Sequence, residues 1–178
     1  MYEVRDELET GLADCNRAIE LDPTQAWAFL GRGNIHLDEG RYRKAVEDFT
    51  TAIEIDALYS QAYFNRALAL IELDDYESAL NDLGTVIEIT PNDVHVYQAR
   101  CTTYAALERF DDALDDCETA LEIDPEEPIT YWALGIVYDG RENYVDALDS
   151  YRRYVELAGD DADEFVFERI EELEDKVK

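Results

Sequence analysis

Apolar residues recur along this chain at helical spacing, and the pattern itself repeats every 34 residues. Within residues 94–127, one apolar stripe runs from Tyr97 to Tyr104 and, after a short break, a second runs from Phe110 to Ala120. Apolar positions three and four residues apart predict amphipathic helices. Each repeating unit is therefore expected to be a pair of helices joined by a short turn.

A proline closes most of the units and shows their period. The unit described above ends near Pro125, and successive steps of 34 residues back along the chain reach Pro91, Ala57 and Pro23. A fixed period of this length is typical of repeat proteins, in which each unit packs only on its neighbours. The sequence therefore predicts an all-α solenoid that forms one domain over residues 1–178.

The period also divides the chain. We expect an N-terminal half-repeat, four complete repeats and a capping helix, at residues 1–25, 26–59, 60–93, 94–127, 128–161 and 162–178. The half-repeat corresponds to the second helix of a later unit. One face of the capping helix carries Val166, Ile170, Leu173 and Val177, and its other face is mostly charged. That distribution is expected of a helix that seals the end of a solenoid.

The charge balance narrows the choice of partner. The chain has 15 Lys and Arg residues against 44 Asp and Glu residues, a formal net charge of −29. Nucleic-acid binding depends on cationic contacts to phosphate, so no nucleic-acid partner is expected. Anionic lipid would be repelled and a basic partner attracted. Solubility, or adaptation to a salty cytoplasm, explains the same acidity without a partner.

Location is inferred from what the chain lacks. No run of about 18 or more apolar residues is present, so no membrane-spanning helix is expected. The chain begins MYEVRDELETGL, with acidic residues where a secretory signal has basic and then apolar ones. We therefore expect a cytoplasmic protein without a membrane partner.

Residues able to carry chemistry are few. Cys15, Cys101 and Cys117 form no CxxC motif and have no nearby His in the sequence, so we expect buried free thiols. His36 and His95 are too far apart for a metal-binding pair, and His36 replaces apolar residues of other repeats. Phosphate-binding, dinucleotide-binding and nucleophile-elbow motifs are also absent from the sequence. We expect no enzymatic activity, metal or cofactor.

The units resemble the tetratricopeptide repeat family over essentially the whole chain. The fourth repeat carries the first-helix signature of that family, and the first repeat carries the second-helix signature: Tyr131, Leu134, Gly135 and Tyr138, then Ala45 and Phe49. The resemblance implies antiparallel helix pairs that stack into a right-handed superhelix. It also implies that the first helices line a concave groove.

One departure from the family signature is systematic. Where the family has Leu, the first three repeats have Arg32, Arg66 and Arg100, and only the fourth has Leu134. Sixteen residues after each of these positions stand Asp48, Asp82, Asp116 and, in the fourth repeat, Ser150. Because Arg and Asp are lost together, we predict an Arg–Asp bridge inside each of the first three helix pairs. The alternative is a row of arginines that binds an anionic ligand.

Small residues follow each of these positions on the first helix, where they would let the paired helix approach closely. They are Gly33, Ala67, Cys101 and Gly135. On the second helix we expect them to face alanines, namely Ala45, Ala79, Ala113 and Ala147.

The resemblance places the partner-binding groove on residues that project from the first helices. They are Trp27, Leu30, Asn34, Gln61, Phe64, Leu68, Ile71, His95, Gln98, Thr102, Ile129, Trp132 and Ile136. More than half of these residues are apolar, and a large exposed apolar patch usually has a use. The charged residues predicted to border the groove are Asp38, Glu72 and Asp139. Lys or Arg residues should therefore flank the apolar residues of a partner.

These features favour a non-catalytic scaffold for protein–protein interaction that binds an apolar or basic peptide or helix in its groove. A different hypothesis is a self-assembling structural subunit. Because the chain begins with an unpaired second helix and ends with an unpaired first helix, the two ends would join head to tail and give filaments. A third is that the chain is a piece of a longer repeat protein.

Overall fold

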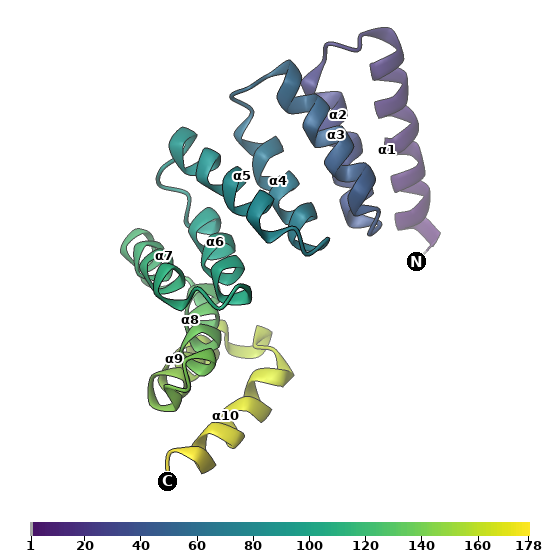
Figure 1. The fold of residues 1–178 in the computed structure, drawn as a ribbon. Helices are drawn as coiled ribbons and strands as arrows, with labels where there is room; N and C mark the ends of the chain where they lie inside the picture. The colour runs from purple at the N-terminus through teal and green to yellow at the C-terminus, as the bar shows by residue number, and fades with distance from the viewer. Residues whose placement is uncertain (1) are drawn as a thin grey trace. The chain divides into compact units, whose positions relative to one another are not determined.

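The computed structural model describes residues 2–178, with side chains from Leu8 onward. These residues form ten α-helices, one short 3₁₀ helix (η1) and no strand (Figure 1). The helices are α1 (Tyr2–Leu21), α2 (Ala26–Asp38), α3 (Tyr42–Ile55), α4 (Ser60–Ile71), α5 (Tyr76–Ile89), α6 (Val94–Ala106), α7 (Phe110–Ile123), α8 (Pro128–Gly140), α9 (Tyr144–Ala158), η1 (Gly159–Asp161) and α10 (Glu164–Lys176). The predicted all-α fold is confirmed.

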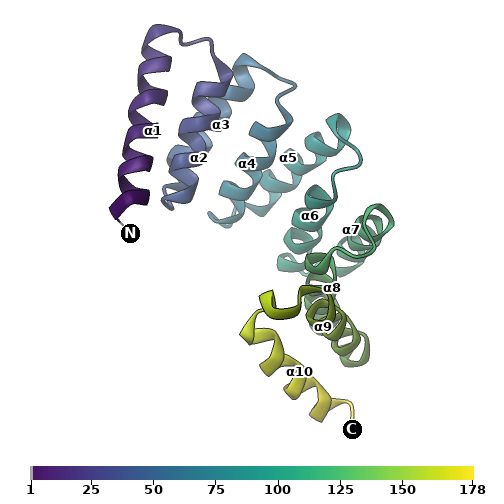
Figure 2. The same cartoon turned by 180° about the vertical axis from the view of Figure 1, so that it is seen from behind.

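The chain forms two compact units. The first covers Met1–Pro91 and contains α1 to α5, and the second covers Asn92–Lys178 and contains α6 to α10. Within each unit, consecutive helices pack on one another as antiparallel pairs (Figures 1 and 2). A single domain over residues 1–178 stays a prediction.

Every helix pair turns at the same position of its repeat. Gly40, Asp74, Glu108 and Glu142 follow one another at intervals of 34 residues, and all four have a left-handed backbone with φ between 56° and 70°. Such a residue ends a helix abruptly, which lets the second helix begin two residues later. Glycine adopts this conformation without strain, and the other three residues do not.

Closely packed residues lie sixteen positions apart within a pair. A Cβ added to Gly33 on α2 would meet the ring of Phe49 on α3, and one added to Gly135 on α8 would meet the ring of Tyr151 on α9. Phe49 and Tyr151 are thus the nearest neighbours of the two glycines, and the expectation that the small residues face alanines stays a prediction. Both rings belong to residues four positions further along the second helix than these alanines, and a large side chain on one helix fits opposite a small one on the other.

The third repeat shows the same pairing as a covalent bond. Cys101 on α6 and Cys117 on α7 form a disulfide, with Cα atoms 5.7 Å apart. The expectation of free thiols is wrong for these two residues, because the positions that hold a small and a large side chain elsewhere bring the two sulfur atoms together. Cys15 is a free cysteine and is half-buried. Disulfides are rare in the cytosol, so this bond gives no support to a cytoplasmic location.

Helix α10 packs on α9 and seals the second unit (Figure 2). Val166 and Leu173 are fully buried and Ile170 packs against the same cluster, as the sequence predicts. Val177 is exposed. The opposite face of α10 is not entirely charged, since Phe165 and Phe167 are 65% and 45% exposed.

Between residues 2 and 178, no helix combines the length and the apolar character needed to cross a membrane.

Candidate functional site

The Arg–Asp bridges predicted from the sequence are present in the first three repeats. Arg66 on α4 donates through Nε and one terminal nitrogen to the two carboxylate oxygens of Asp82 on α5, both at 2.7 Å. Arg32–Asp48 and Arg100–Asp116 have the same two-pronged geometry, at 2.6–2.9 Å. The aspartate side chains are 7% exposed and the arginines 20–25%. These arginines are thus occupied inside their helix pairs, which argues against a row of free arginines.

Each of these guanidinium groups also has an aromatic neighbour. The side chain three residues earlier on the same helix lies under the guanidinium carbon, at 5.6 Å for Phe29 and Tyr63 and at 5.7 Å for Tyr97. Tyr104 lies 5.9 Å from Arg100. Such contacts add a cation–π attraction to the ion pair. The desolvation penalty opposes the charged form, but the hydrogen bonds to aspartate outweigh it and raise the pKa of all three arginines.

A third partner completes the arginine site in the first unit. The remaining terminal nitrogen of Arg32 donates to Asn16 Oδ1 on α1 at 2.8 Å, and that of Arg66 donates to Thr50 Oγ1 on α3 at 3.0 Å. Each acceptor lies on the second helix of the preceding pair, sixteen residues before the arginine. Arg32 and Arg66 each therefore link three helices through hydrogen bonds: their own helix, the second helix of their pair and the helix before it.

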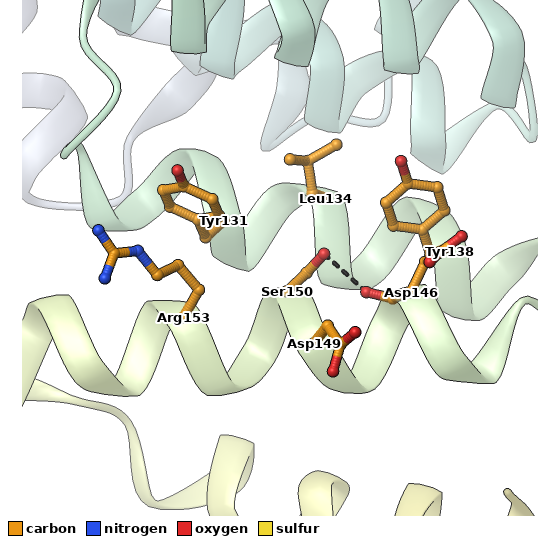
Figure 3. Close-up of a pocket in the computed structure, with 7 residues that line it drawn as sticks. All are labelled: Tyr131, Leu134, Tyr138, Asp146, Asp149, Ser150 and Arg153. Carbon is orange, nitrogen blue, oxygen red and sulfur yellow. Dashed lines mark hydrogen bonds between the residues drawn. The ribbon is translucent and has the colours of Figure 1, made fainter.

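The fourth repeat has a pocket in place of this ion pair. Figure 3 shows Leu134 of α8 and Ser150 of α9 at its centre, between Tyr131 at one end and Tyr138 at the other. The pocket has a volume of about 270 Å³, and its remaining lining residues are Asp146, Asp149 and Arg153. The Ser150 hydroxyl donates to the backbone carbonyl of Asp146 at 2.8 Å, so it is turned along its own helix.

In the first unit, the predicted groove residues lie on two neighbouring helices. Trp27, Leu30 and Asn34 are on α2, and Gln61, Phe64, Leu68 and Ile71 are on α4. The two helices are joined by Asn65, whose amide nitrogen donates to Asn34 Oδ1 at 2.6 Å. Trp27 is 55% exposed and the other apolar members are half-buried. These seven residues form what we call the α2–α4 face.

In the second unit, the corresponding residues lie on α6 and α8. They are His95, Gln98 and Thr102, then Ile129, Trp132 and Ile136. Ile129 is 50% exposed, whereas Trp132 and Ile136 are half-buried and pack against the hydrophobic core. We call these six residues the α6–α8 face. A groove that runs over all four repeats stays a prediction.

Two side chains of the predicted groove have structural partners. Gln98 is 5% exposed, and its amide nitrogen donates to Thr130 Oγ1 on α8 at 2.8 Å. Asp139 accepts two hydrogen bonds from Arg169 of α10, both at 2.6 Å. Gln98 therefore joins two helices, and the charge of Asp139 is neutralised by a residue that the sequence alone did not bring near it.

The histidine, cysteine and acidic side chains of the described residues are the candidate metal ligands. Among the described residues, no group of three or more His, Cys, Asp or Glu side chains is placed to hold a metal ion. His36 is buried, as the sequence predicts, and lies beside Asp48. Burial, followed by the positive charge of Arg41, lowers the pKa of His36.

The fold and these surfaces define a class of protein, namely stacked helical hairpins that present side chains from their first helices. A family model described as tetratricopeptide repeat matches residues 30–94 and 100–162, which is more than half of the sequence. The chain belongs to the tetratricopeptide repeat family. Proteins of this family are generally scaffolds for protein–protein interaction, and their fold is not a catalytic one.

Solved structures show the same fold. A tetratricopeptide repeat protein from Parabacteroides merdae is 21% identical, with a TM-score of 0.83 over 97% of this chain and 68% of the other. YrrB, a TPR protein described as having an unusual peptide-binding site, is 24% identical, with a TM-score of 0.78 over 96% and 86%. MamA from Desulfovibrio magneticus RS-1 is 20% identical, with a TM-score of 0.80 over 88% and 89%. No curated protein sequence matches the chain.

Proposed function

We propose that this protein is a non-catalytic interaction scaffold whose first helices bind a partner segment that combines apolar and basic residues. The observation that carries the proposal is the α2–α4 face, where Trp27, Phe64 and Leu68 remain exposed or half-buried on adjacent helices. Aromatic side chains on a rigid surface are the usual anchors of an interface. A partner that covered them would remove apolar surface from water.

The charge of the face supports a basic partner. Asp38 is the last residue of α2 and Glu72 is the C-cap of α4, and both are exposed. With a net charge of −29 over the chain, an approaching cationic segment would be attracted over a long range at low salt. Lys or Arg residues on either side of an apolar core are therefore the expected composition of the partner. The peptide-binding description of YrrB, a relative in fold, supports a peptide as the ligand.

The test is a peptide-display selection on the whole protein, followed by titration of each selected peptide into wild type and variants. Tryptophan fluorescence gives the readout, because both tryptophans belong to the predicted site. Phe64→Ala and Trp132→Ala should weaken binding by about tenfold or more, the scale of losing a buried aromatic anchor. Phe165→Ala is the matched control, since Phe165 is an exposed aromatic residue on α10.

Two results would contradict the proposal. One is unchanged affinity in both groove variants while their helical circular dichroism is intact. The other is a set of selected peptides rich in acidic residues. Either would move the binding surface away from the first helices.

A second candidate function is head-to-tail self-association into filaments. It is favoured by the exposed Phe165 and Phe167 on α10, the helix that would have to pair with the α1 of another copy. Against it, Arg169 stands where the other first helices carry a small residue, and it is held by Asp139 and Glu172. Sedimentation at increasing protein concentration tests whether filaments form. Assembly that is abolished by the double change Phe165→Ser with Phe167→Ser would support filaments, and a protein that stays monomeric at every concentration would exclude them.

A further inference from the structure

The pocket of the fourth repeat occupies the place of an arginine site that has lost its arginine. Leu134 and Ser150 stand where the first three repeats carry the bridging Arg and Asp. In those repeats, a guanidinium group lies between an aromatic side chain of the first helix and a carboxylate of the second. The chain thus contains three filled examples of the site, and one that is open (Figure 3).

The fourth repeat keeps the aromatic walls of the site. Tyr131 corresponds to Phe29, Tyr63 and Tyr97, the rings that lie under the three guanidinium groups. Tyr138 corresponds to Tyr104, the second ring beside Arg100. Both tyrosines line the pocket, one at each end. A planar cation that enters between them would meet the ring of Tyr138, as Arg100 meets the ring of Tyr104, because Arg153 already lies over Tyr131.

The fourth repeat also keeps negative charge, although from different residues. Asp146 and Asp149 line the pocket from α9. Glu118 of α7 stands sixteen residues before Leu134, the position from which Asn16 and Thr50 accept a hydrogen bond from Arg32 and Arg66. Burial raises the pKa of Tyr138, the charges of Asp146 and Glu118 raise it further, and the charge of Arg141 opposes them.

The pocket lining contains one cation, Arg153. Arg153 lies over the Tyr131 ring at 5.8 Å. Its terminal nitrogen donates to Glu156 at 2.7 Å, so its charge is already paired. Figure 3 shows Arg153 at the Tyr131 end of the pocket, whereas Tyr138 and Asp146 lie at the other end.

We propose that this pocket binds the side chain of an arginine supplied by a partner protein, which takes the place that Arg32, Arg66 and Arg100 take within the chain. Arginine is favoured over lysine because its flat guanidinium group stacks on tyrosine and donates to two carboxylates at once, whereas an ammonium group is a compact point charge. The site lies between the helices of one pair, so it stands or falls independently of binding to the first-helix faces.

An NMR titration of the whole protein, labelled with ¹³C in its tyrosine rings, tests this proposal. The probes are N-acetyl-arginine methylamide, the matching lysine derivative, and the citrulline derivative, which has the shape of arginine without its charge. The ring signals of Tyr131 and Tyr138 should shift saturably with the arginine probe. Binding should be about threefold weaker with lysine, on the scale of one exposed cation–π contact, and citrulline should produce no shift.

Variants separate this pocket from general attraction to an acidic chain. Asp149→Asn should weaken arginine binding about threefold, the scale of one exposed ion pair. Asp115→Asn is the matched control, because it removes the corresponding acid of the third repeat, where Arg100 already fills the site. Leu134→Arg with Ser150→Asp copies the first three repeats, and it should abolish binding by placing the chain's own guanidinium in the pocket.

Three results would overturn the proposal. They are a lack of saturable shifts with the arginine probe, equal binding of arginine and citrulline, or equal weakening by Asp149→Asn and Asp115→Asn. If the double variant loses its helical circular dichroism, the comparison of the two single aspartate variants still decides the question.

Discussion

The ring of Phe49 fills the space that a side chain on residue 33 would need, since a Cβ added to Gly33 would lie 2.5 Å from Phe49 Cε1. Phe49 is fully buried, and protein interiors are close-packed, so an added methyl group would press on the ring. Gly135 stands in the same relation to Tyr151. In the second repeat, Ala67 takes the place of the glycine and is larger, and Leu83 takes the place of the phenylalanine and is smaller. Both are fully buried.

Gly33→Ala should therefore destabilise the protein, although alanine is the better helix former. The gain in helix propensity is about 1 kcal/mol, and overpacking a full core costs about 1–3 kcal/mol. We expect a net loss of about 1 kcal/mol in urea unfolding. Adding Phe49→Leu, which copies Ala67 and Leu83, should recover most of the loss. A single variant as stable as wild type would show that the ring has room to shift.

The Arg66–Asp82 bridge predicts a strong effect of losing one partner. Asp82→Ala would leave Arg66 without its carboxylate in a partly buried site, which should cost about 2–4 kcal/mol. Arg66→Leu with Asp82→Ser, as found at Leu134 and Ser150, should restore most of that stability. The free energies of unfolding of the two variants are the measurement. If the double change is as harmful as the single one, the bridge does not account for the loss.

The Cys101–Cys117 disulfide predicts one reactive thiol per chain in denaturant, from Cys15, and three after reduction. Closing a loop of this length contributes about 3 kcal/mol through the unfolded chain, so a reducing agent should lower the urea midpoint. Cys101→Ala with Cys117→Leu should make the midpoint insensitive to reductant. Three reactive thiols before reduction would mean that the bond does not form in solution.

The sequence predicted the all-α fold and the Arg–Asp bridges well, because both depend on local signals. Apolar residues at helical spacing give the helices, and Arg and Asp sixteen residues apart give the bridges. The disulfide was missed because the pairing of Cys101 with Cys117 depends on which side chains meet across a helix pair. The ring of Phe49 beside Gly33 was missed for the same reason.

The turn at Glu108 predicts a stabilising change. Glu108 has φ of 56°, where a side chain costs about 1–2 kcal/mol. Glycine removes that strain and loses about 0.5–1 kcal/mol through the greater freedom of the unfolded chain. Glu108→Gly should therefore raise stability by about 0.5 kcal/mol or more. Glu126→Gly is the control in an ordinary turn, and it should lower stability. A decrease for both would mean that the unfolded chain dominates.

Tyr151 predicts a loss of stability in alkali. Its burial raises the pKa from 10.0 to about 12, and the charge of Asp139 adds to the shift. Between these pH values the unfolded state loses the phenolic proton while the folded state keeps it, so stability falls as pH rises, by up to about 1.4 kcal/mol per pH unit. Tyr151→Phe should reduce this slope. The measurement is unfolding between about pH 9 and pH 12, a range that includes the tyrosine pKa of the unfolded chain and the raised pKa of Tyr151. An unchanged slope would assign the alkaline loss to other tyrosines.

The candidate sites were harder to predict than the fold. Trp27 and Ile129 are exposed, consistent with a binding role, but Gln98 is buried because its amide joins α6 to α8. The pocket between Tyr131 and Tyr138 had a signal in the sequence, the joint loss of Arg and Asp in one repeat. That loss indicated a missing bridge. Whether the space closes or stays open depends on the packing around Leu134, which spacing does not encode.

The offset of sixteen residues between bonded partners has a kinetic consequence. Arg with Asp, Gly with Phe and Cys with Cys all meet within one helix pair, so the chain makes these contacts by closing short loops. Proteins dominated by such local contacts have low contact order and fold fast. A pair such as α2 and α3 has all the residues of its own bridge as soon as its second helix has been synthesised. Folding can therefore proceed pair by pair during translation, without waiting for the end of the chain.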